Sequence, residues 1–126
     1  MTIHQRLSGD VTILDIEGEI TTEQRGEMLR EAIRGLLDRE HKRILLNLEL
    51  VRFIDSSGLG DLIALKKAAL VGGADLKLLR PQKKVYSVLA ETSLSKVFEC
   101  FDDEGAAIAS FGARVRSSRS DGTEAN

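Results

Sequence analysis

The sequence predicts a single α/β domain with a mixed four- to five-stranded sheet and helices mainly on one face of that sheet. Three observations indicate this fold. With 126 residues, the chain can bury one compact core. Segments rich in β-branched residues alternate with segments whose apolar residues follow helical spacing. The run from Arg43 to Val51 is almost continuously apolar, which is typical of a parallel strand covered on both faces. We therefore expect Arg43 to Leu48 to be the central strand.

The N-terminal part of the chain predicts a hairpin followed by a helix. Ile3 to Leu7 is the first expected strand, and the turn-forming run Ser8-Gly9-Asp10 separates it from a second strand, Val11 to Gly18. Thr21, with Gln24 three residues later, has the spacing of a capping box and predicts a helix start. The apolar face of this helix consists of Leu29, Ala32, Ile33, Leu36 and Leu37.

The middle of the chain predicts a strand, a loop, a helix and another strand. The loop over Arg52 to Ser57 follows the central strand and leads into a helix over Gly58 to Val71. Gly72-Gly73 ends that helix, because glycine readily takes the backbone conformation of a helix C-terminus. Ala74 to Leu79 is the next expected strand.

The C-terminal part predicts two more helices and a short strand. Pro81 suits the first position of a helix whose buried side contains Val85, Val88 and Leu89. Val97 to Phe101 is the last expected strand. Asp102 and Asp103 then cap a final helix that runs through Phe111. The residues that follow are mostly polar, so we expect a domain over residues 1–111 and a disordered polar tail over residues 112–126.

The composition argues against several classes of protein. The net charge is −2, from 18 basic and 20 acidic residues, whereas nucleic-acid binders usually carry a clear basic excess. No run approaches the roughly 20 apolar residues that span a bilayer, and the N-terminal residues lack the apolar core of a signal peptide. A single cysteine, Cys100, fits a reducing compartment. We expect a cytoplasmic protein with no membrane span and no direct contact with nucleic acid.

The motifs of common enzymes are missing. Ser56 and Ser57 lack the glycine two residues earlier that a Gly-x-Ser-x-Gly nucleophile elbow requires. The two histidines, His4 and His41, are far apart in the sequence, and one cysteine with two scattered histidines gives no metal-ligand spacing. No phosphate-binding Gly-x-x-x-x-Gly-Lys loop is present. We therefore expect no enzyme, no cofactor and no metal.

One segment combines polar and small residues at a position where α/β proteins place functional groups. Phe53-Ile54-Asp55-Ser56-Ser57-Gly58-Leu59-Gly60 joins the central strand to a helix. Working residues of α/β proteins commonly follow the carboxyl ends of parallel strands. Asp, Ser and Gly are also good helix-starting residues, so the segment has a purely structural interpretation as well.

This segment resembles the signature of STAS domains, in particular bacterial anti-sigma factor antagonists. Gly18-Glu19-Ile20 and Leu46-Asn47-Leu48 also stand where that family has its Gly-Glu-Leu and Leu-Asp-Leu segments. The resemblance extends from about Ile3 to Phe111 and implies a STAS fold. Two positions depart from the family pattern: Thr21 replaces an aspartate after the Gly-Glu-Leu segment, and Asn47 replaces an aspartate of the buried strand.

The resemblance implies a switch based on phosphorylation. The first serine of the Asp-Ser-Ser-Gly run, here Ser56, is the implied phosphoacceptor of a cognate anti-sigma factor that is itself a serine kinase. The unphosphorylated form binds this factor and frees the sigma factor, and a PP2C-type phosphatase resets the switch. Asp55 and Ser57 flank the acceptor, and Gly58 is expected to let the backbone of the partner come close.

The helix after the motif has two apolar sides. At about 100° per residue, the side that we expect in the core consists of Leu59, Leu62, Ile63, Lys66 and Leu70. On that side Lys66 extends past the core to solvent. The other side consists of Asp61, Ala64, Leu65 and Ala68, and we interpret it as a docking surface, the alternative being a helix that is buried on both sides. The candidate partner-binding residues are Asp55, Ser57, Gly58, Leu59, Asp61, Ala64, Leu65 and Ala68.

Two other functions are compatible with parts of the sequence. Some STAS domains are soluble subunits of membrane lipid-transport ABC complexes, and these often lack a serine at the position of Ser56. A small hydrolase is a third interpretation, which the missing elbow and base disfavour. The serine at position 56 favours the switch.

Overall fold

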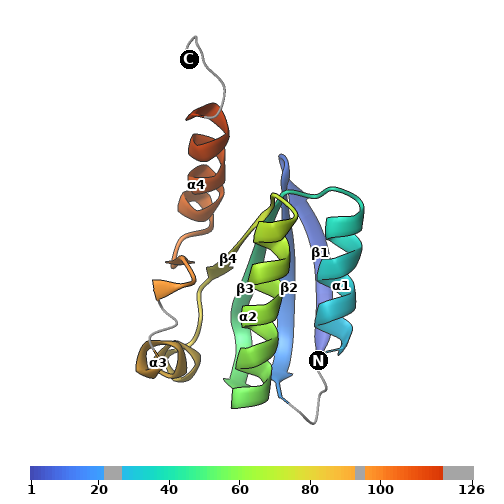
Figure 1. Ribbon diagram of the computed structural model, residues 1–126. Helices are drawn as coiled ribbons and strands as arrows, with labels where there is room; N and C mark the ends of the chain where they lie inside the picture. The colour runs from blue at the N-terminus through green and yellow to red at the C-terminus, as the bar shows by residue number, and fades with distance from the viewer. Residues whose placement is uncertain (22–26, 93–95, 118–126) are drawn as a thin grey trace.

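The computed structural model describes residues 1–21, 27–92 and 96–117 and confirms a mixed five-stranded sheet with the strand order β1-β2-β3-β4-β5 (Figure 1). β1 (Thr2–Ser8) and β2 (Val11–Ile20) form the expected antiparallel hairpin. Gly9 in its turn has φ of 62°, a left-handed conformation that glycine adopts without strain. The capping box with Gln24 lies outside the described residues.

The central strand is β3 (Arg43–Ile54), as predicted. It pairs in parallel with β2 on one side and with β4 (Asp75–Leu79) on the other, and the short β5 (Cys100–Phe101) pairs in parallel with β4. Ile44 and Leu46 are buried on one face of β3, and Leu45 is buried on the opposite face. The strand is therefore covered on both faces.

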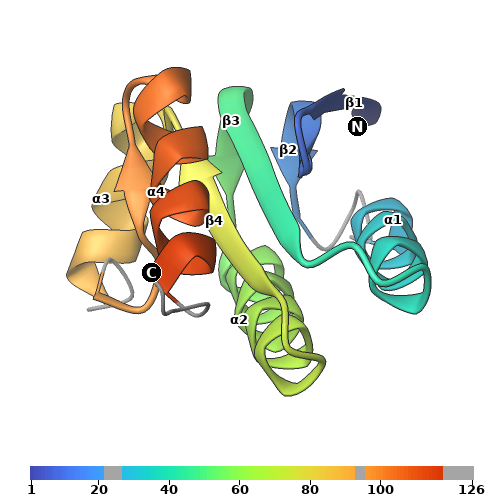
Figure 2. The ribbon, with the colours of Figure 1, turned by 90° about the horizontal axis from the view of Figure 1, so that it is seen from above.

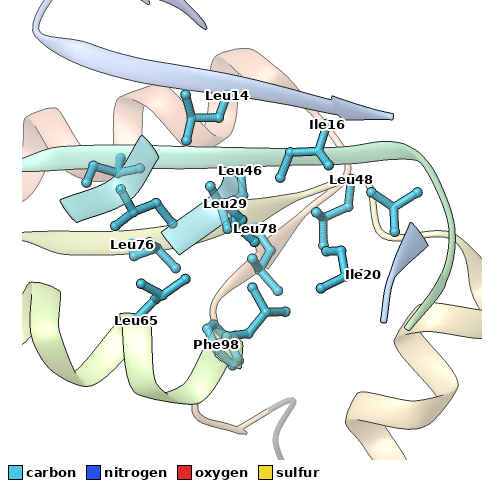
Figure 3. Packing of buried hydrophobic residues seen from close by; sticks show 14 of the residues in the cluster. Leu14, Ile16, Ile20, Leu29, Leu46, Leu48, Leu65, Leu76, Leu78 and Phe98 are labelled. Carbon is cyan, nitrogen blue, oxygen red and sulfur yellow. The ribbon is translucent and has the colours of Figure 1, made fainter. Parts of the chain in front are cut away.

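In the described part of the chain, four helices cover the sheet, three on one face and one on the other. α1 (Glu27–Asp38), α2 (Ser56–Val71) and α3 (Lys83–Glu91) contribute to the larger core, while α4 (Glu104–Ser117) packs on the opposite face (Figure 2). In the larger core, side chains of the strands meet α2 and the segment before β5, as Figure 3 shows for Leu46, Leu76, Leu65 and Phe98. The smaller core under α4 consists of Val11, Ile13, Leu45, Leu79, Ala107 and Phe111.

The boundary of the motif segment differs from the prediction. The expected loop over Arg52 to Ser57 is wrong, because β3 continues to Ile54 and α2 begins at Ser56. The cause is the longer pairing with β2, in which Ile20 at the end of β2 faces Ile54. Two irregularities in this ladder shift its register, and no pattern of residues in the sequence indicates them.

Other boundaries differ as well, among them the start of the last strand, which is Cys100 and not Val97. Pro81 does not start α3: Gln82 is the N-cap, with extended backbone, and the helix begins at Lys83. Arg80, just before the proline, has φ of 51° and turns the chain there, while its N–H donates to the Phe101 carbonyl. At the other end, Asp103 caps α4 as expected, through its Oδ2 and the N–H of Ala106 at 2.8 Å. That helix extends to residue 117, past the expected end.

An ionic network ties α4 to the hairpin. The Arg6 guanidinium on β1 contacts Asp15 Oδ2 at 2.7 Å and Glu104 Oε1 at 2.7 Å. Asn47 on β3 donates its amide to Asp15 Oδ1 at 2.8 Å. The departure at position 47 thus has a local reason, because an aspartate there would place a second carboxylate against Asp15. The hydrogen bonds from Arg6 hold the pKa of the Asp15 carboxyl, and that of Glu104, below their ordinary values.

Arg6→Gln should lower the free energy of unfolding by roughly 1 kcal/mol at neutral pH, since partly exposed ion pairs contribute about 0.2–1 kcal/mol each. Both carboxyl pKa values are depressed in the folded state, so their contribution is present above the unfolded values, about 3.9 and 4.3. It is lost as the pH falls through the folded values. Urea unfolding from pH 7 to pH 2 measures this, and the difference between wild type and variant should shrink below about pH 4.

Arg52→Gln is the matched control, because Arg52 lies 3.9 Å from Glu19 in a more exposed pair. It should change stability little at any pH. A stability difference for Arg6→Gln that stays constant down to pH 2 would contradict the role given to the two carboxylates.

Candidate functional site

The candidate site is the junction between the carboxyl end of β3 and the first turn of α2. Asp55 is the N-cap residue, with extended backbone, and its Oδ1 accepts a hydrogen bond from the Gly58 N–H at 2.8 Å. Its carbonyl accepts from the Leu59 N–H at 2.9 Å. These two bonds begin the helix, so the helix-starting interpretation of this segment holds for Asp55.

Ser56 and Ser57 are the first two residues of α2, and both are exposed. Backbone N–H groups in the first turn of a helix have no intrahelical acceptor and create positive potential there. A negatively charged group on either serine would therefore meet favourable local electrostatics. The structure places Ser56 at the exposed N-terminus of the helix, within the segment that the sequence singled out.

Gly58 is fixed by a contact within the chain. A Cβ atom at this position would lie 2.0 Å from the carbonyl oxygen of Ile20 and 2.9 Å from its Cγ2. The same carbonyl accepts a hydrogen bond from the Asp55 N–H at 3.3 Å. The end of β2 thus touches the first turn of α2, and only glycine fits between them. The prediction that Gly58 makes room for a partner is wrong, since Gly58 is buried against Ile20.

The two sides of α2 differ from the prediction. Leu65 is 1% exposed and belongs to the larger core, whereas Leu70 is 54% exposed. Leu65 lies three residues after Leu62 and four before Ala69, so all three share the core side of the helix. The placement of Leu65 on a docking surface, and of Leu70 in the core, was therefore wrong. The buried residues of α2 are Gly58, Leu59, Leu62, Leu65, Lys66 and Ala69.

Lys66 does not extend to solvent as expected. Its Nζ donates to Asp75 Oδ1 at 2.8 Å and to the Leu76 carbonyl at 2.9 Å, both on β4. The pair is largely buried, and the Phe98 ring lies 6.0 Å from the ammonium group. This buried, hydrogen-bonded pair fixes α2 against β4.

The remaining candidate partner-binding residues of α2 lie at i, i+3 and i+7 and share one face of the helix. Ala64 is exposed, while Asp61 and Ala68 are half-buried. Asp61 Oδ2 forms an ion pair with Arg30 Nη1 of α1 at 3.1 Å. Asp61 therefore lies on the side of α2 nearer α1, while Ala64, three residues later, is exposed.

Two exposed apolar residues near the junction were not among the partner-binding residues predicted from the sequence. Leu50 and Phe53, near the end of β3, are 57% and 47% exposed. Along β3, Glu49 and Leu50 are both exposed, and so are Arg52 and Phe53, whereas strict alternation would bury one residue of each pair. The register shifts between β2 and β3 explain this departure from alternation. Their apolar character beside the motif was the available signal.

Thr21 follows the end of β2 and is buried. A carboxylate at this position would therefore be removed from solvent.

Within residues 1–21, 27–92 and 96–117, no three His, Cys, Asp or Glu side chains are grouped as metal ligands would be. Among the helices in the described part of the chain, none has the length and apolar character needed to cross a membrane.

Comparison with known families and structures gives a consistent result. The family model of the STAS domain matches residues 3–107. A candidate anti-sigma factor antagonist from Thermotoga maritima is 26% identical and superposes with a TM-score of 0.79, covering 86% of this chain and 92% of its own.

Two other solved structures show the same fold at lower identity. The anti-sigma factor antagonist SpoIIAA of Bacillus, in its unphosphorylated form, is 20% identical with a TM-score of 0.74, covering 89% of this chain and 97% of its own. A sulfate transporter family protein from Wolinella succinogenes is also 20% identical, with a TM-score of 0.68, and the match covers 87% of this chain and 91% of that one.

Gly58→Ala should destabilise the fold by about 1–3 kcal/mol or more, because the new methyl group would overlap a backbone carbonyl. Gly60→Ala is the matched control: a Cβ there meets no atom within 4 Å. It should stabilise the helix by up to about 1 kcal/mol. Denaturant unfolding monitored by circular dichroism measures both changes. Equal effects of the two substitutions would contradict the close contact with Ile20.

Leu65→Ala should lower the free energy of unfolding by about 2–5 kcal/mol, as expected for a leucine in a packed core. Leu70→Ala, on the exposed side of the same helix, should stay within about 0.5 kcal/mol of wild type. Thermal and denaturant unfolding of the two variants shows which side of α2 packs in the core. A neutral Leu65→Ala would show that Leu65 is not part of the core.

Proposed function

The chain belongs to the STAS domain family, and we propose that it is an anti-sigma factor antagonist whose binding is switched by phosphorylation of Ser56. In its unphosphorylated form it binds a cognate anti-sigma factor and so frees the sigma factor. That anti-sigma factor is also the serine kinase that phosphorylates Ser56 and thereby ends the complex. The observation that carries this proposal is the exposed Ser56 at the first position of α2, on a junction fixed by Asp55 and Gly58.

The geometry of the junction supports Ser56 as an acceptor. The serine is exposed, and the residue before it directly follows the strand and caps the helix, so the backbone around the hydroxyl is held in one conformation. A kinase then meets a preformed site and need not order a flexible loop. The Thermotoga relative, described as a candidate anti-sigma factor antagonist, supports the same class of function.

The effect of the phosphate follows from charge. A phosphoserine adds about −1.5 to −2 charges at neutral pH. The first turn of α2 tolerates that charge, because helix N-termini favour anions. A docked partner would instead have to remove the phosphate from water, near the carboxylates of Asp55 and Asp61. Burying a charge without a partner costs several kcal/mol, enough to end a tight complex.

The protein itself acts as a binding module and not as an enzyme in this proposal. Its partners are the anti-sigma factor serine kinase and a PP2C-type phosphatase that removes the phosphate and restores binding. It needs no cofactor or metal, does not contact nucleic acid directly, and works in the cytoplasm with its partners. Residues 112–126 have no assigned role in this proposal.

The alternative is a soluble subunit of a membrane lipid-transport ABC complex. The similarity to a sulfate transporter family protein, at 20% identity, shows a shared fold alone. The exposed serine at position 56 distinguishes the two proposals, since a subunit that works without phosphorylation has no use for it.

Incubation of the chain with its cognate kinase and ATP, followed by mass spectrometry, tests the proposal. Phosphate should appear on Ser56, and Ser56→Ala should bind the kinase constitutively. Ser56→Asp should bind the kinase at least about a hundredfold more weakly. Burying its charge without a partner costs several kcal/mol, and each step of about 1.4 kcal/mol corresponds to a tenfold change in affinity. Ser57→Ala is the matched control and should be phosphorylated and bind like wild type. Phosphate on Ser57, or on neither serine, would refute the assignment.

A further inference from the structure

We propose that the anti-sigma factor kinase docks on the exposed face of the sheet at the carboxyl ends of β2 and β3, where Leu50 and Phe53 are the apolar anchors. This inference rests on the proposed function and identifies the surface that the partner covers besides Ser56. The surface, which we call the open face, consists of Glu17, Glu19, Leu50, Arg52 and Phe53.

The alternation along β2 determines where its last side chains point. Ile16 and Ile20 are buried in the larger core, which lies between the sheet and the three helices on that side. Successive residues of a strand point to opposite faces of the sheet, so Glu17 and Glu19 point away from that core. Glu17 is exposed, and Glu19 is partly exposed.

The end of β3 shares this orientation. In the parallel ladder, Leu50 is paired with Glu17, and Phe53 is paired with Glu19. Paired residues on adjacent strands lie on the same face of a sheet, so both apolar side chains point to the side opposite the larger core. The Arg52 guanidinium lies 3.9 Å from the Glu19 carboxylate, which agrees with that orientation.

No helix of the described chain covers the open face. On this side of the sheet, α4 begins beside the contact of Arg6 with Glu104 and runs toward Phe111, which packs with residues near the starts of β2 and β3. Figure 1 shows α4 beside the upper part of the sheet and the arrowheads of β2 and β3 at its lower end. Leu50 and Phe53 therefore stay 57% and 47% exposed. Single exposed apolar residues are ordinary, but two on one uncovered face form a surface suited to a partner.

The open face adjoins the phosphoacceptor. Phe53 precedes Ser56 by three residues, so their Cα atoms are at most about 11 Å apart. The Asp55 N–H donates to the carbonyl of Ile20, next to Glu19, which brings the end of β2 to the same place. A stable interface buries about 800 Å² on each partner. A kinase that encloses Ser56 in such an interface therefore also covers the surface beside the first turn of α2.

The open face offers the anchors that the start of α2 lacks. The exposed residues there, Ser56, Ser57 and Gly60, are polar or small. The centres of protein interfaces are rich in aromatic side chains, which bury a large apolar area. Phe53, together with Leu50, supplies this apolar area on the side of the sheet away from the larger core.

The charges around the anchors define the complementary surface of the kinase. Glu17 lies beside Leu50, and Glu19 lies beside Phe53. The two carboxylates outnumber the one basic residue of the open face, Arg52. The kinase should therefore present an apolar hollow with basic side chains at its rim, because opposite charges at an interface rim guide association.

The test measures the affinity of the purified kinase that phosphorylates the wild-type chain on Ser56. Isothermal titration calorimetry without ATP, on the full unphosphorylated chain, should show that Leu50→Ala and Phe53→Ala each weaken binding at least about tenfold, as interface anchors do. Leu70→Ala is the matched control, because Leu70 is similarly exposed, at 54%, but lies near the far end of α2. It should bind like wild type, and all three variants should keep the wild-type unfolding midpoint.

A second arm tests the charge of the rim. Glu17→Lys should slow association about tenfold at low ionic strength, and the difference should fade near about 0.5 M salt because salt screens exposed charges. An association rate that Glu17→Lys leaves unchanged at low ionic strength would show that the kinase does not face this side of the sheet.

Wild-type affinity in both Leu50→Ala and Phe53→Ala would overturn this inference, while phosphorylation of Ser56 and weak binding by Ser56→Asp would leave the proposed function intact. A wild-type chain that is dimeric by light scattering, and that the same two substitutions make monomeric, would show that a second copy covers the open face, and would also overturn it. A wild-type chain that no kinase phosphorylates on Ser56 would refute both.

Discussion

The contact between the Ile20 carbonyl and the backbone of Gly58 determines where α2 begins, and the candidate site depends on it. The carbonyl at the end of β2 accepts the Asp55 N–H and leaves no room for a side chain at position 58. Asp55 in turn caps the helix through the Gly58 N–H. Strand, cap and helix are thereby locked together, and Ser56 and Ser57 are presented to solvent at a fixed point.

The rest of α2 is held as firmly as its first turn. The buried pair of Lys66 and Asp75 joins it to β4, leucines of its core side pack into the larger core, and the pair of Asp61 and Arg30 joins it to α1. A helix fixed on three sides is a poor candidate for a switch that works by moving. A phosphate on such a platform changes the charge of a surface that stays in place, and the partner senses that charge directly.

Much of the fold followed from the sequence, because the apolar run of β3 and the spacing in α1 have one simple interpretation each. The buried side of α2 did not follow from the sequence, since both sides are apolar and periodicity alone does not say which one meets the sheet. For this reason Leu65 was predicted to be exposed and Leu70 buried, whereas the reverse holds. The role of Gly58 depends on Ile20, a residue distant in sequence, and on a strand pairing with register shifts. Ser56 was placed correctly because its position depends on local signals, a cap and a strand end.

Phosphorylation should alter the surface around Ser56 while the fold stays unchanged. Two-dimensional ¹H–¹⁵N NMR spectra of the uniformly labelled chain, recorded before and after phosphorylation of Ser56, distinguish a change of surface from a change of fold. Amide shifts should change at residues of the first turn of α2 and at the adjoining end of β2, with the amides of the remaining sheet and helices unaffected. Shift changes spread through β3, β4 and α4 would show instead that the phosphate acts by rearranging the fold.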